Sequence, residues 1–186
     1  MPVPEGSPGD LLLGSLGYRV RWTSWVLELP EGVEIATRAL PAGFTVRTST
    51  EADWASAYAV QEDAFLEWSD REREDFDDWA ARVLRRPGFE PWHLRVVEDP
   101  TGEVVAMAYV TGAAQGKAYV DRLATRTDQR GRGLAQALLV DAFATARLHG
   151  ATSSTLSTDS RTGALGLYEK VGMQVSSTWV NRAVVL

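Results

Sequence analysis

The sequence predicts a mixed α/β fold (α+β in type) whose elements follow the order β-α-α-β-β-β-α-β-α-β. Three observations support this fold class. Strand-like segments alternate with segments of helical periodicity, three strands in the middle follow one another as a meander, and the composition of 45% hydrophobic and 24% charged residues is that of a globular protein. A length of 186 residues suits one domain with a short appendage.

The first 43 residues are expected to be an extension of the domain. Residues 1–10 are rich in proline and glycine and predict a flexible leader. Residues 17–29 carry β-branched and aromatic side chains and predict a strand. Residues 30–43 resemble a linker, so the domain itself is expected at 44–186.

The elements of the domain are predicted from periodicity, capping residues and turn residues. Thr50 and Asp53 form a capping box before the first helix, and Ser69 and Glu72 form another before the second helix. Strands are expected at 44–47, 93–98, 103–111, 117–125, 152–158 and 173–186. Helices are expected at 51–64, 69–86, 133–149 and 163–170, and a turn is expected at 112–116.

The net charge of −6 is concentrated in one segment. Residues 62–78 hold nine acidic residues and two arginines, whereas the rest of the chain holds 16 acidic and 17 basic residues. A general nucleic-acid binder needs a basic patch, so we expect no nucleic-acid partner.

Other features exclude several functional classes. The chain has no cysteine, which excludes disulfides, thiolate metal ligands and a catalytic thiol, and its two histidines, His93 and His149, suggest no metal site. We see no signal peptide, no apolar run of membrane-spanning length and no G-x-S-x-G motif, so a cytoplasmic protein that is not a serine hydrolase is expected.

The most informative stretch is residues 123–139, where a predicted strand, a glycine-rich loop and a long helix follow one another. Free N–H groups and the helix dipole at such a start favour an anion, and Arg130 and Arg132 add donors suited to phosphate. A Walker A loop does not match. A dinucleotide fingerprint fails at Gln136, where its third glycine belongs. A helix start with exposed arginines and no ligand is the remaining alternative.

Two motifs together resemble the GNAT acyltransferases. Residues 130–135, RGRGLA, match the family's [QR]-x-x-G-x-[GA] signature, and residues 167–173, LYEKVGM, resemble its later L-Y-E-K-x-G-[FM] segment. The resemblance covers about residues 44–186. It implies the GNAT fold, a mixed and mostly antiparallel sheet with helices on both faces, together with the extra N-terminal strand.

The resemblance implies acetyl-CoA as the cofactor. The backbone of one strand is expected to pair with the pantetheine arm through Leu123, Ala124 and Thr125. The loop expected to hold the pyrophosphate comprises Arg130, Gly131, Arg132, Gly133, Leu134 and Ala135. Many relatives carry an asparagine before the conserved tyrosine, where this chain has Ser160 and Arg161, so that cofactor contact departs from the family pattern.

The resemblance also implies catalytic roles. Tyr168 is expected to protonate the departing thiolate, although a half-buried structural tyrosine is the alternative. Asp121 is the candidate base, and strand alternation places it on the same face as Leu123. Glu62 and Asp63 are rival candidates for the base, because the family's acceptor site is built partly by the first helix and the loop that follows it.

The acceptor side carries two further expectations. Trp68, in a loop, is expected to line the acceptor pocket against a cation. The acidic segment is either the solvated face of a helix or a field that attracts a cationic amine.

We therefore expect a single-domain N-acetyltransferase that moves an acetyl group directly to a primary amine of a small molecule. A catalytically silent acyl-CoA sensor is the alternative. Residues 16–26 are similar to residues 171–180, and coincidence between two amphipathic strands is one explanation. The other is that residues 11–29, which resemble the end of a GNAT domain, are the tail of a second, lost domain, as in tandem GNAT proteins such as mycothiol synthase. We expect a monomer or homodimer in which this strand docks on the sheet of its own chain or of a partner.

Overall fold

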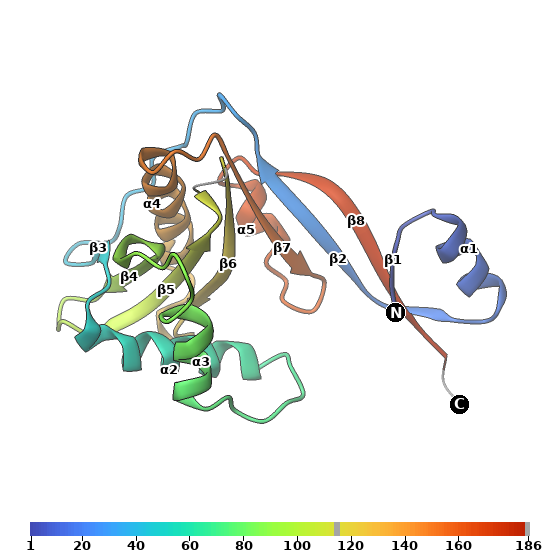
Figure 1. Cartoon of the computed structure of the whole chain (residues 1–186), viewed down its shortest axis with the longest axis horizontal. Coiled ribbons are helices and arrows are strands. Elements are labelled where there is room, and N and C mark those ends of the chain that lie inside the picture. Colours follow the sequence, from blue (N-terminus) through green and yellow to red (C-terminus); the bar gives the residue numbers. More distant parts are fainter. Residues whose placement is uncertain (114–115, 185–186) are drawn as a thin grey trace.

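The computed structural model describes residues 1–113 and 116–184, which form an eight-stranded sheet in the order β1-β8-β2-β7-β6-β5-β4-β3 (Figure 1). The strands are β1 (Pro2–Pro4), β2 (Arg19–Leu29), β3 (Thr45–Thr48), β4 (Leu94–Glu98), β5 (Val104–Thr111), β6 (Lys117–Thr125), β7 (Ser153–Asp159) and β8 (Gln174–Ala183). The α-helices are α1 (Pro8–Ser15), α2 (Trp54–Leu66), α3 (Phe76–Val83), α4 (Leu134–Leu148) and α5 (Leu165–Glu169). The predicted turn at 112–116 and strand at 173–186 lie partly outside the described residues.

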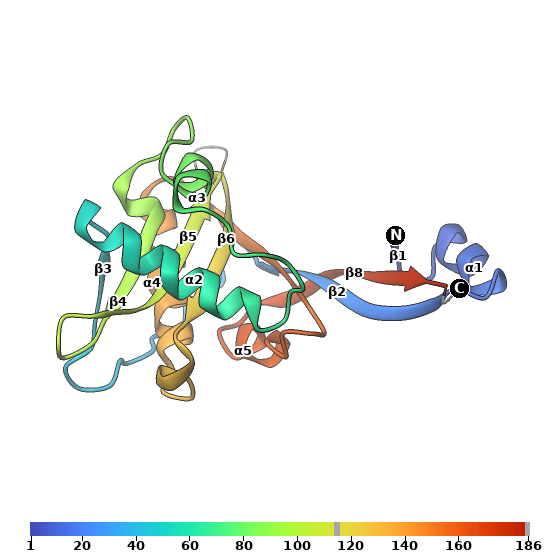
Figure 2. The same cartoon turned by 90° about the horizontal axis from the view of Figure 1, so that it is seen from below.

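The sheet is mixed and mostly antiparallel, which confirms the predicted fold class. Strands β6 and β7 run parallel, and the other neighbouring pairs of the described sheet are antiparallel. Helices α2 and α3 cover one face and α4 covers the other (Figures 1 and 2). Strand β5 is therefore buried on both sides, and its uninterrupted apolar run from Val104 to Val110 suits that position.

Two apolar cores hold the layers together. Beneath α4, Leu138 and Phe143 belong to one core with Leu27 and Leu29 of β2. Beneath α2 and α3, the fully buried Trp79 belongs to a second core. Because β2 supplies fully buried leucines to the first core, the N-terminal segment takes part in the main packing of the protein.

The predicted start of α3 is wrong. The helix begins at Phe76, where Asp75 caps it by accepting a backbone N–H of the first turn at 2.8 Å. Segment 69–72 is a loop instead. Its Arg71 donates two hydrogen bonds, both 2.8 Å long, to the buried carboxylate of Glu62. These bonds hold the segment against α2, and it does not form a helix.

The predicted flexible leader at residues 1–10 is also wrong. Pro2–Pro4 pair with β8 as β1, and α1 begins at Pro8. Proline suits the first turn of a helix because that turn needs no N–H donor there. Asp10 is buried and pairs with Arg182 of β8 at 2.5 Å. Proline and glycine here mark a turn and a helix start.

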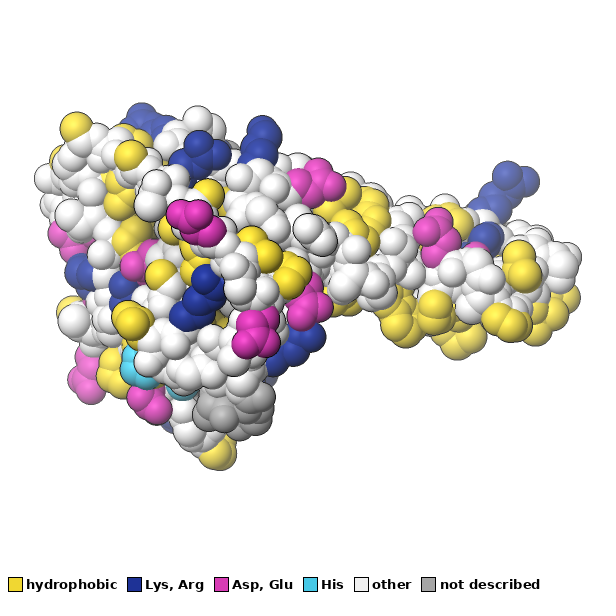
Figure 3. Space-filling model, turned by 90° about the horizontal axis from the view of Figure 1, so that it is seen from above, with side chains coloured by type: hydrophobic (Ala, Val, Ile, Leu, Met, Phe, Trp, Pro, Cys, Tyr) yellow, Lys and Arg dark blue, Asp and Glu magenta, His cyan; other side chains and the backbone are white. Residues whose placement is uncertain are grey.

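The strand predicted at 17–29 is present as β2, and it lies in the sheet of its own chain. It is antiparallel to β7 on one side and to β8 on the other. Beyond the body of the protein, β1, β2 and β8 form a ribbon that projects outward, with α1 at its far end (Figures 1 and 3). We call residues 1–23 and 174–184 the arm.

Candidate active site

A cleft opens where β6 and β7 separate. The two strands pair only as far as Val120 and Leu156, after which β6 continues against β5 and β7 continues against β2. The separation leaves a cleft of about 1000 Å³. Along it, the inner edges of both strands have no partner strand in the described sheet. Unpaired backbone donors and acceptors on a strand edge are suited to an extended ligand.

Asp121 occupies a β-bulge in β6. The register with β5 shifts between Val120 and Arg122, so Asp121 is the extra residue. A bulge bends the strand and re-aims a side chain. The Asp121 side chain is 36% exposed and lines the cleft together with Leu123. The predicted base therefore lies beside the predicted pantetheine strand.

The glycine-rich loop lies at the other wall of the cleft, directly before α4. Gly131 and Gly133 adopt φ angles of 76° and 81°, which side chains other than glycine rarely tolerate. Gly133 is the N-cap of the 15-residue helix α4, so free N–H groups and the positive end of the helix dipole face this region. Leu134 and Ala135 line the cleft as well.

Two buried oxygen atoms beside the loop have no hydrogen-bond partner within the described residues. They are Oγ1 of Thr125 and Oε1 of Gln129, and both residues line the cleft. Buried polar atoms are almost always hydrogen-bonded in folded proteins. Two buried oxygens without partners are consistent with a polar ligand in the cleft.

Arg130 bridges the loop and the end of α2. Its guanidinium donates to both carboxylate oxygens of Glu67 at 2.6 and 2.8 Å and to the carbonyl of Thr125 at 3.1 Å. The Thr127 hydroxyl also donates to Glu67 at 2.7 Å. The Arg130 guanidinium, and secondarily this hydroxyl, hold the pKa of the Glu67 carboxyl below its usual range. The predicted phosphate-binding arginine is thus paired with an acidic residue that also lines the cleft.

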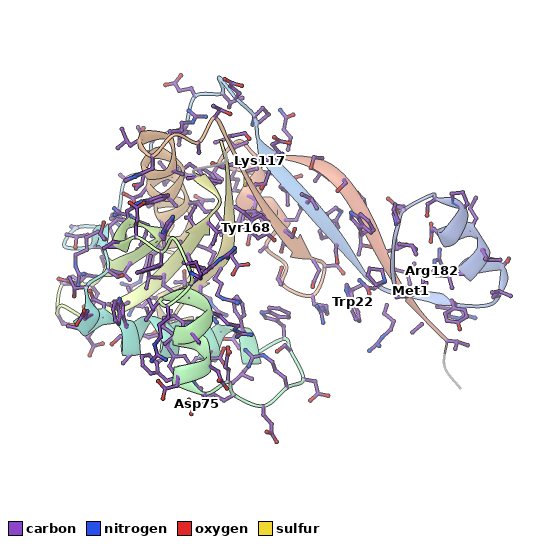
Figure 4. All side chains as sticks on the ribbon, in the orientation of Figure 1. Met1, Trp22, Asp75, Lys117, Tyr168 and Arg182 are labelled. Atoms are coloured by element: carbon purple, nitrogen blue, oxygen red, sulfur yellow. The ribbon has the colours of Figure 1, made fainter. Side chains whose placement is uncertain are left out.

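Tyr168 reaches the cleft from α5. Its side chain is 8% exposed, and Figure 4 shows it beside the separating strands. Burial raises the pKa of the Tyr168 phenol, and a hydrogen bond with Thr158 opposes this effect only in part. A phenol in this setting keeps its proton at neutral pH and can donate it.

A third carboxylate, Asp159, lines the cleft at the carboxyl end of β7. Arg161 donates to it at 2.5 Å, and the Arg161 guanidinium carbon lies 4.2 Å from the Trp22 ring centre and 5.1 Å from the Trp68 ring centre. The three contacts join β2, the loop after β7 and the loop after α2 at the mouth of the cleft. Trp68, which we expected to meet a cation, faces Arg161.

Two residues predicted for the acceptor site do not line the cleft. The side chain of Glu62 is fully buried, where it accepts from Arg71 and from the backbone of the same loop. Asp63 is exposed and pairs with Arg73. The sequence pattern identifies the right helix, but the helical turn directs these two carboxylates away from the cleft.

Two residues predicted for the cofactor site also lie outside it. The Arg132 guanidinium carbon lies 5.8 Å from the ring centre of Phe44, so the side chain covers a hydrophobic surface. Ser160 accepts the backbone N–H of Thr23 at 3.2 Å and ties the loop after β7 to β2. Leu123, Ala124, Thr125, Arg130, Gly131, Gly133, Leu134, Ala135 and Arg161 do line the cleft.

The sequence reasoning missed nine polar residues of the cleft, namely Ser24, Glu67, Gln129, Gln136, Ser157, Thr158, Asp159, Thr162 and Lys170. Asp159 could have been found from the sequence, because it ends a predicted strand directly before Ser160 and Arg161, which occupy the place of the family's asparagine. Ser24 had none, since only the insertion of β2 beside β7 brings it to the cleft.

The cleft fits acetyl-CoA. It combines an unpaired strand edge for an extended amide-containing arm, a positive helix start with two glycines for a diphosphate, and buried oxygens that lack partners. A Cβ atom added at Gly131 or Gly133 would meet no atom within 4 Å, so the space before the loop is open.

Two features are absent from the described residues. No group of three or more acidic or histidine side chains there is arranged to hold a metal ion. No helix among these residues has both the length and the hydropathy needed to cross a membrane.

Comparison with known proteins agrees with this geometry. Residues 54–173 match the acetyltransferase (GNAT) family, and no curated protein matches the chain. The fold and the cleft have the architecture of this family. The chain belongs to the GNAT acetyltransferase family.

Several solved structures are similar to the chain. A GCN5-related N-acetyltransferase from Sphaerobacter thermophilus is 27% identical with a TM-score of 0.82, over 97% of this chain and 57% of that chain. A GCN5-related N-acetyltransferase from Kribbella flavida is 23% identical with a TM-score of 0.68, over 97% of this chain and 66% of that chain. A GNAT family acetyltransferase from Brucella melitensis, in complex with acetyl-CoA, is 19% identical with a TM-score of 0.56, over 76% and 96%. The chain thus spans less than two thirds of the first two.

Proposed function

We propose that this protein transfers an acetyl group from acetyl-CoA directly to a primary amine of a small, cationic acceptor. One observation carries the proposal: the buried hydroxyl of Tyr168 shares a cleft with the glycine-rich loop and with two carboxylates, Asp121 and Asp159. The chain contains no cysteine, so no thiol is present to carry the acetyl group between the two substrates.

Acetyl-CoA, when bound, supplies an acetyl group activated as a thioester. The N–H groups of Gly131, Gly133 and the first turn of α4 would hold its diphosphate. The free backbone edge at Leu123–Thr125 would hydrogen-bond its pantetheine arm. Both contributions come from the backbone, which explains why Arg132 is not needed in the cleft.

Two side chains would move protons in this reaction. Asp121 would accept the proton that the acceptor's ammonium must lose before its nitrogen can form the new C–N bond. Tyr168 would donate its phenolic proton to the sulfur as the C–S bond breaks, and its raised pKa keeps that proton available at neutral pH. Asp159 accepts hydrogen bonds from Arg161, one of them 2.5 Å long, whereas Asp121 has only a 3.6 Å contact with Arg122, which makes Asp121 the better base.

The charge of the cleft supports a cationic acceptor. Five of the nine acidic residues in segment 62–78 pair with arginines, and within the described structure Glu67 is the acidic residue of that segment that lines the cleft. Three carboxylates line the cleft, Glu67, Asp121 and Asp159, and three cations line it as well, Arg130, Arg161 and Lys170. A bound diphosphate would neutralise part of that positive charge, and the carboxylates would then attract a cationic amine.

Arg130 and Glu67 would couple the two substrates. In this structure Glu67 is neutralised by Arg130. A bound diphosphate would compete for the same guanidinium and so free the carboxylate of Glu67 to attract the acceptor. Binding of the cofactor would thereby strengthen binding of the amine.

The alternative is a silent acyl-CoA sensor, and one substitution separates the two functions. CoA release would be followed by thiol detection across a panel of mono-, di- and polyamines, with no background from the cysteine-free protein. The enzyme should turn over, and Tyr168→Phe should lower kcat about a hundredfold or more while acetyl-CoA binding persists. Tyr119→Phe, outside the cleft, is the matched control. Absence of turnover with every amine would contradict the proposal.

A further inference from the structure

The arm carries most of the large hydrophobic side chains that this protein exposes. Nine such side chains are exposed among the described residues, and eight of them belong to the arm, with Leu148 of α4 as the exception. Six lie on α1 and on the strand ends beside it, and we call them the tip patch: Met1, Leu11, Leu12, Leu16, Val20 and Val184, which are 41–74% exposed. Figure 3 shows apolar side chains along one border of the arm, and Figure 4 places Met1 and Arg182 beside α1.

An internal repeat shows what kind of surface α1 presents. Gly17 follows α1 and Gly172 follows α5. When these two glycines are aligned, Leu12 of α1 corresponds to Leu167 of α5, and Leu16 just after α1 corresponds to Val171. Val171 is 2% exposed and Leu167 packs against the core beneath α4. Leu12 and Leu16 are 59% and 62% exposed. The same helix–strand unit is therefore packed at one end of the ribbon and uncovered at the other.

The tip patch is also held in a fixed position. Arg182 donates to the buried carboxylate of Asp10 at 2.5 Å and to the carbonyl of Tyr18 at 2.8 Å, and the backbone N–H of Gly6 donates to Asp10 at 2.9 Å. These contacts anchor α1 on β8. A surface that is ordered before association loses less conformational freedom when it binds.

We propose that the tip patch is the interface with a second copy of this chain, and that two arms meet end to end about a twofold axis. A twofold contact uses the same patch on both copies, so it needs no other protein. The six side chains present on the order of 600 Å², close to the roughly 800 Å² that each partner contributes to a standard interface once neighbouring polar atoms are added. Such a patch lies at the upper end of what monomers expose.

The charge distribution favours this arrangement over contacts between the bodies. The arm holds three arginines and two acidic residues, a net charge of +1, which leaves −7 on the rest of the chain. Two bodies of like charge repel each other. An end-to-end contact of the nearly neutral arms places the bodies at opposite ends of the dimer.

Sedimentation equilibrium of the whole protein tests the proposal. We expect a dimer for the wild type, and Leu12→Glu with Leu16→Glu should raise its dissociation constant about a hundredfold or more. Leu148→Glu changes the one large hydrophobic side chain that is exposed outside the arm in the described part of the chain, and this variant should leave the dimer intact. Circular dichroism and acetyl-CoA binding would verify that each variant folds. A wild type that stays monomeric at high concentration, or equal weakening by both variants, would overturn the proposal.

Crosslinking gives a second test that does not require disruptive charges. Because the chain has no cysteine, Leu16→Cys introduces one thiol at the tip and Leu148→Cys introduces one on the body. A short bismaleimide should join two copies through position 16 and not through position 148. Equal crosslinking at the two positions, or none at position 16, would contradict an end-to-end dimer.

Discussion

Glu62 and Asp63 are adjacent, are both paired with arginines, and should respond very differently to loss of charge. Glu62 is fully buried and accepts two hydrogen bonds from Arg71 and one of 2.9 Å from the backbone of Glu74. In Glu62→Gln, one Arg71 contact meets an amide N–H instead of an oxygen, and the remaining hydrogen bonds lose the negative charge of their acceptor. Charge-assisted hydrogen bonds contribute about 1.5–3 kcal/mol each and neutral ones about 1 kcal/mol.

The expected loss for Glu62→Gln is therefore about 2–4 kcal/mol in the free energy of unfolding, reduced from the value for a fully buried pair because Arg71 is 37% exposed and can return to water. Asp63 and Arg73 are 61% and 46% exposed, so Asp63→Asn should cost less than about 0.5 kcal/mol. Urea unfolding at pH 7 measures both. Equal losses for the two variants would refute the reasoning.

The pH dependence of the same pair provides an independent check. The Arg71 guanidinium lowers the pKa of the Glu62 carboxyl below its ordinary value of 4.5. The stabilisation is therefore complete above pH 4.5 and is lost as the pH falls through the lowered pKa. The difference in stability between the wild type and Glu62→Gln should shrink over that acid range. A difference that stayed constant down to low pH would mean that Glu62 carries no charge in the folded protein.

Three further predictions concern the cleft. Gly133→Ala disfavours the positive φ at this position, so the loop should leave its present conformation in the free protein. Regaining that conformation to bind acetyl-CoA would cost about 1–2 kcal/mol and weaken binding about tenfold, as measured by calorimetry. Glu67→Gln should strengthen acetyl-CoA binding severalfold, because the diphosphate no longer competes for Arg130, and should raise KM for the amine; unchanged values would argue against the coupling. Since burial raises the pKa of Tyr168, kcat should fall only above about pH 10, and Tyr168→Phe should abolish that alkaline decline.

The order of the elements in the domain could be predicted because local signals determine it. Thr50 and Asp53 form the expected capping box, and β6 spans the residues that alternation and the neighbouring turn indicate. The N-terminal elements could not be predicted, because a run of proline and glycine looks the same in a flexible leader as in a turn before a helix. The contact between Asp10 and Arg182 joins opposite ends of the chain and leaves no local signal.

The site was predictable where the backbone defines it and less so where side chains do. The positive φ angles of the glycine-rich loop are reflected directly in its glycines, so the loop could be read from the sequence. The direction of a carboxylate on α2 depends on helical phase within one turn, which is why Glu67 rather than Glu62 lines the cleft. The bulge at Asp121 is a property of the pairing of β6 with β5, which no single strand reveals.

The position of β2 between β7 and β8 has a consequence for how the protein is made. During synthesis β2 leaves the ribosome early, but both of its neighbours in the sheet come from the last part of the chain. Pairing of Arg19 with Ala183 closes nearly the whole polypeptide into a loop, and such distant contacts slow folding. Until β7 and then β8 emerge, β2, which carries two tryptophans, has no partner strand. The nascent chain should therefore be prone to aggregation and dependent on chaperones until β8 has been synthesised.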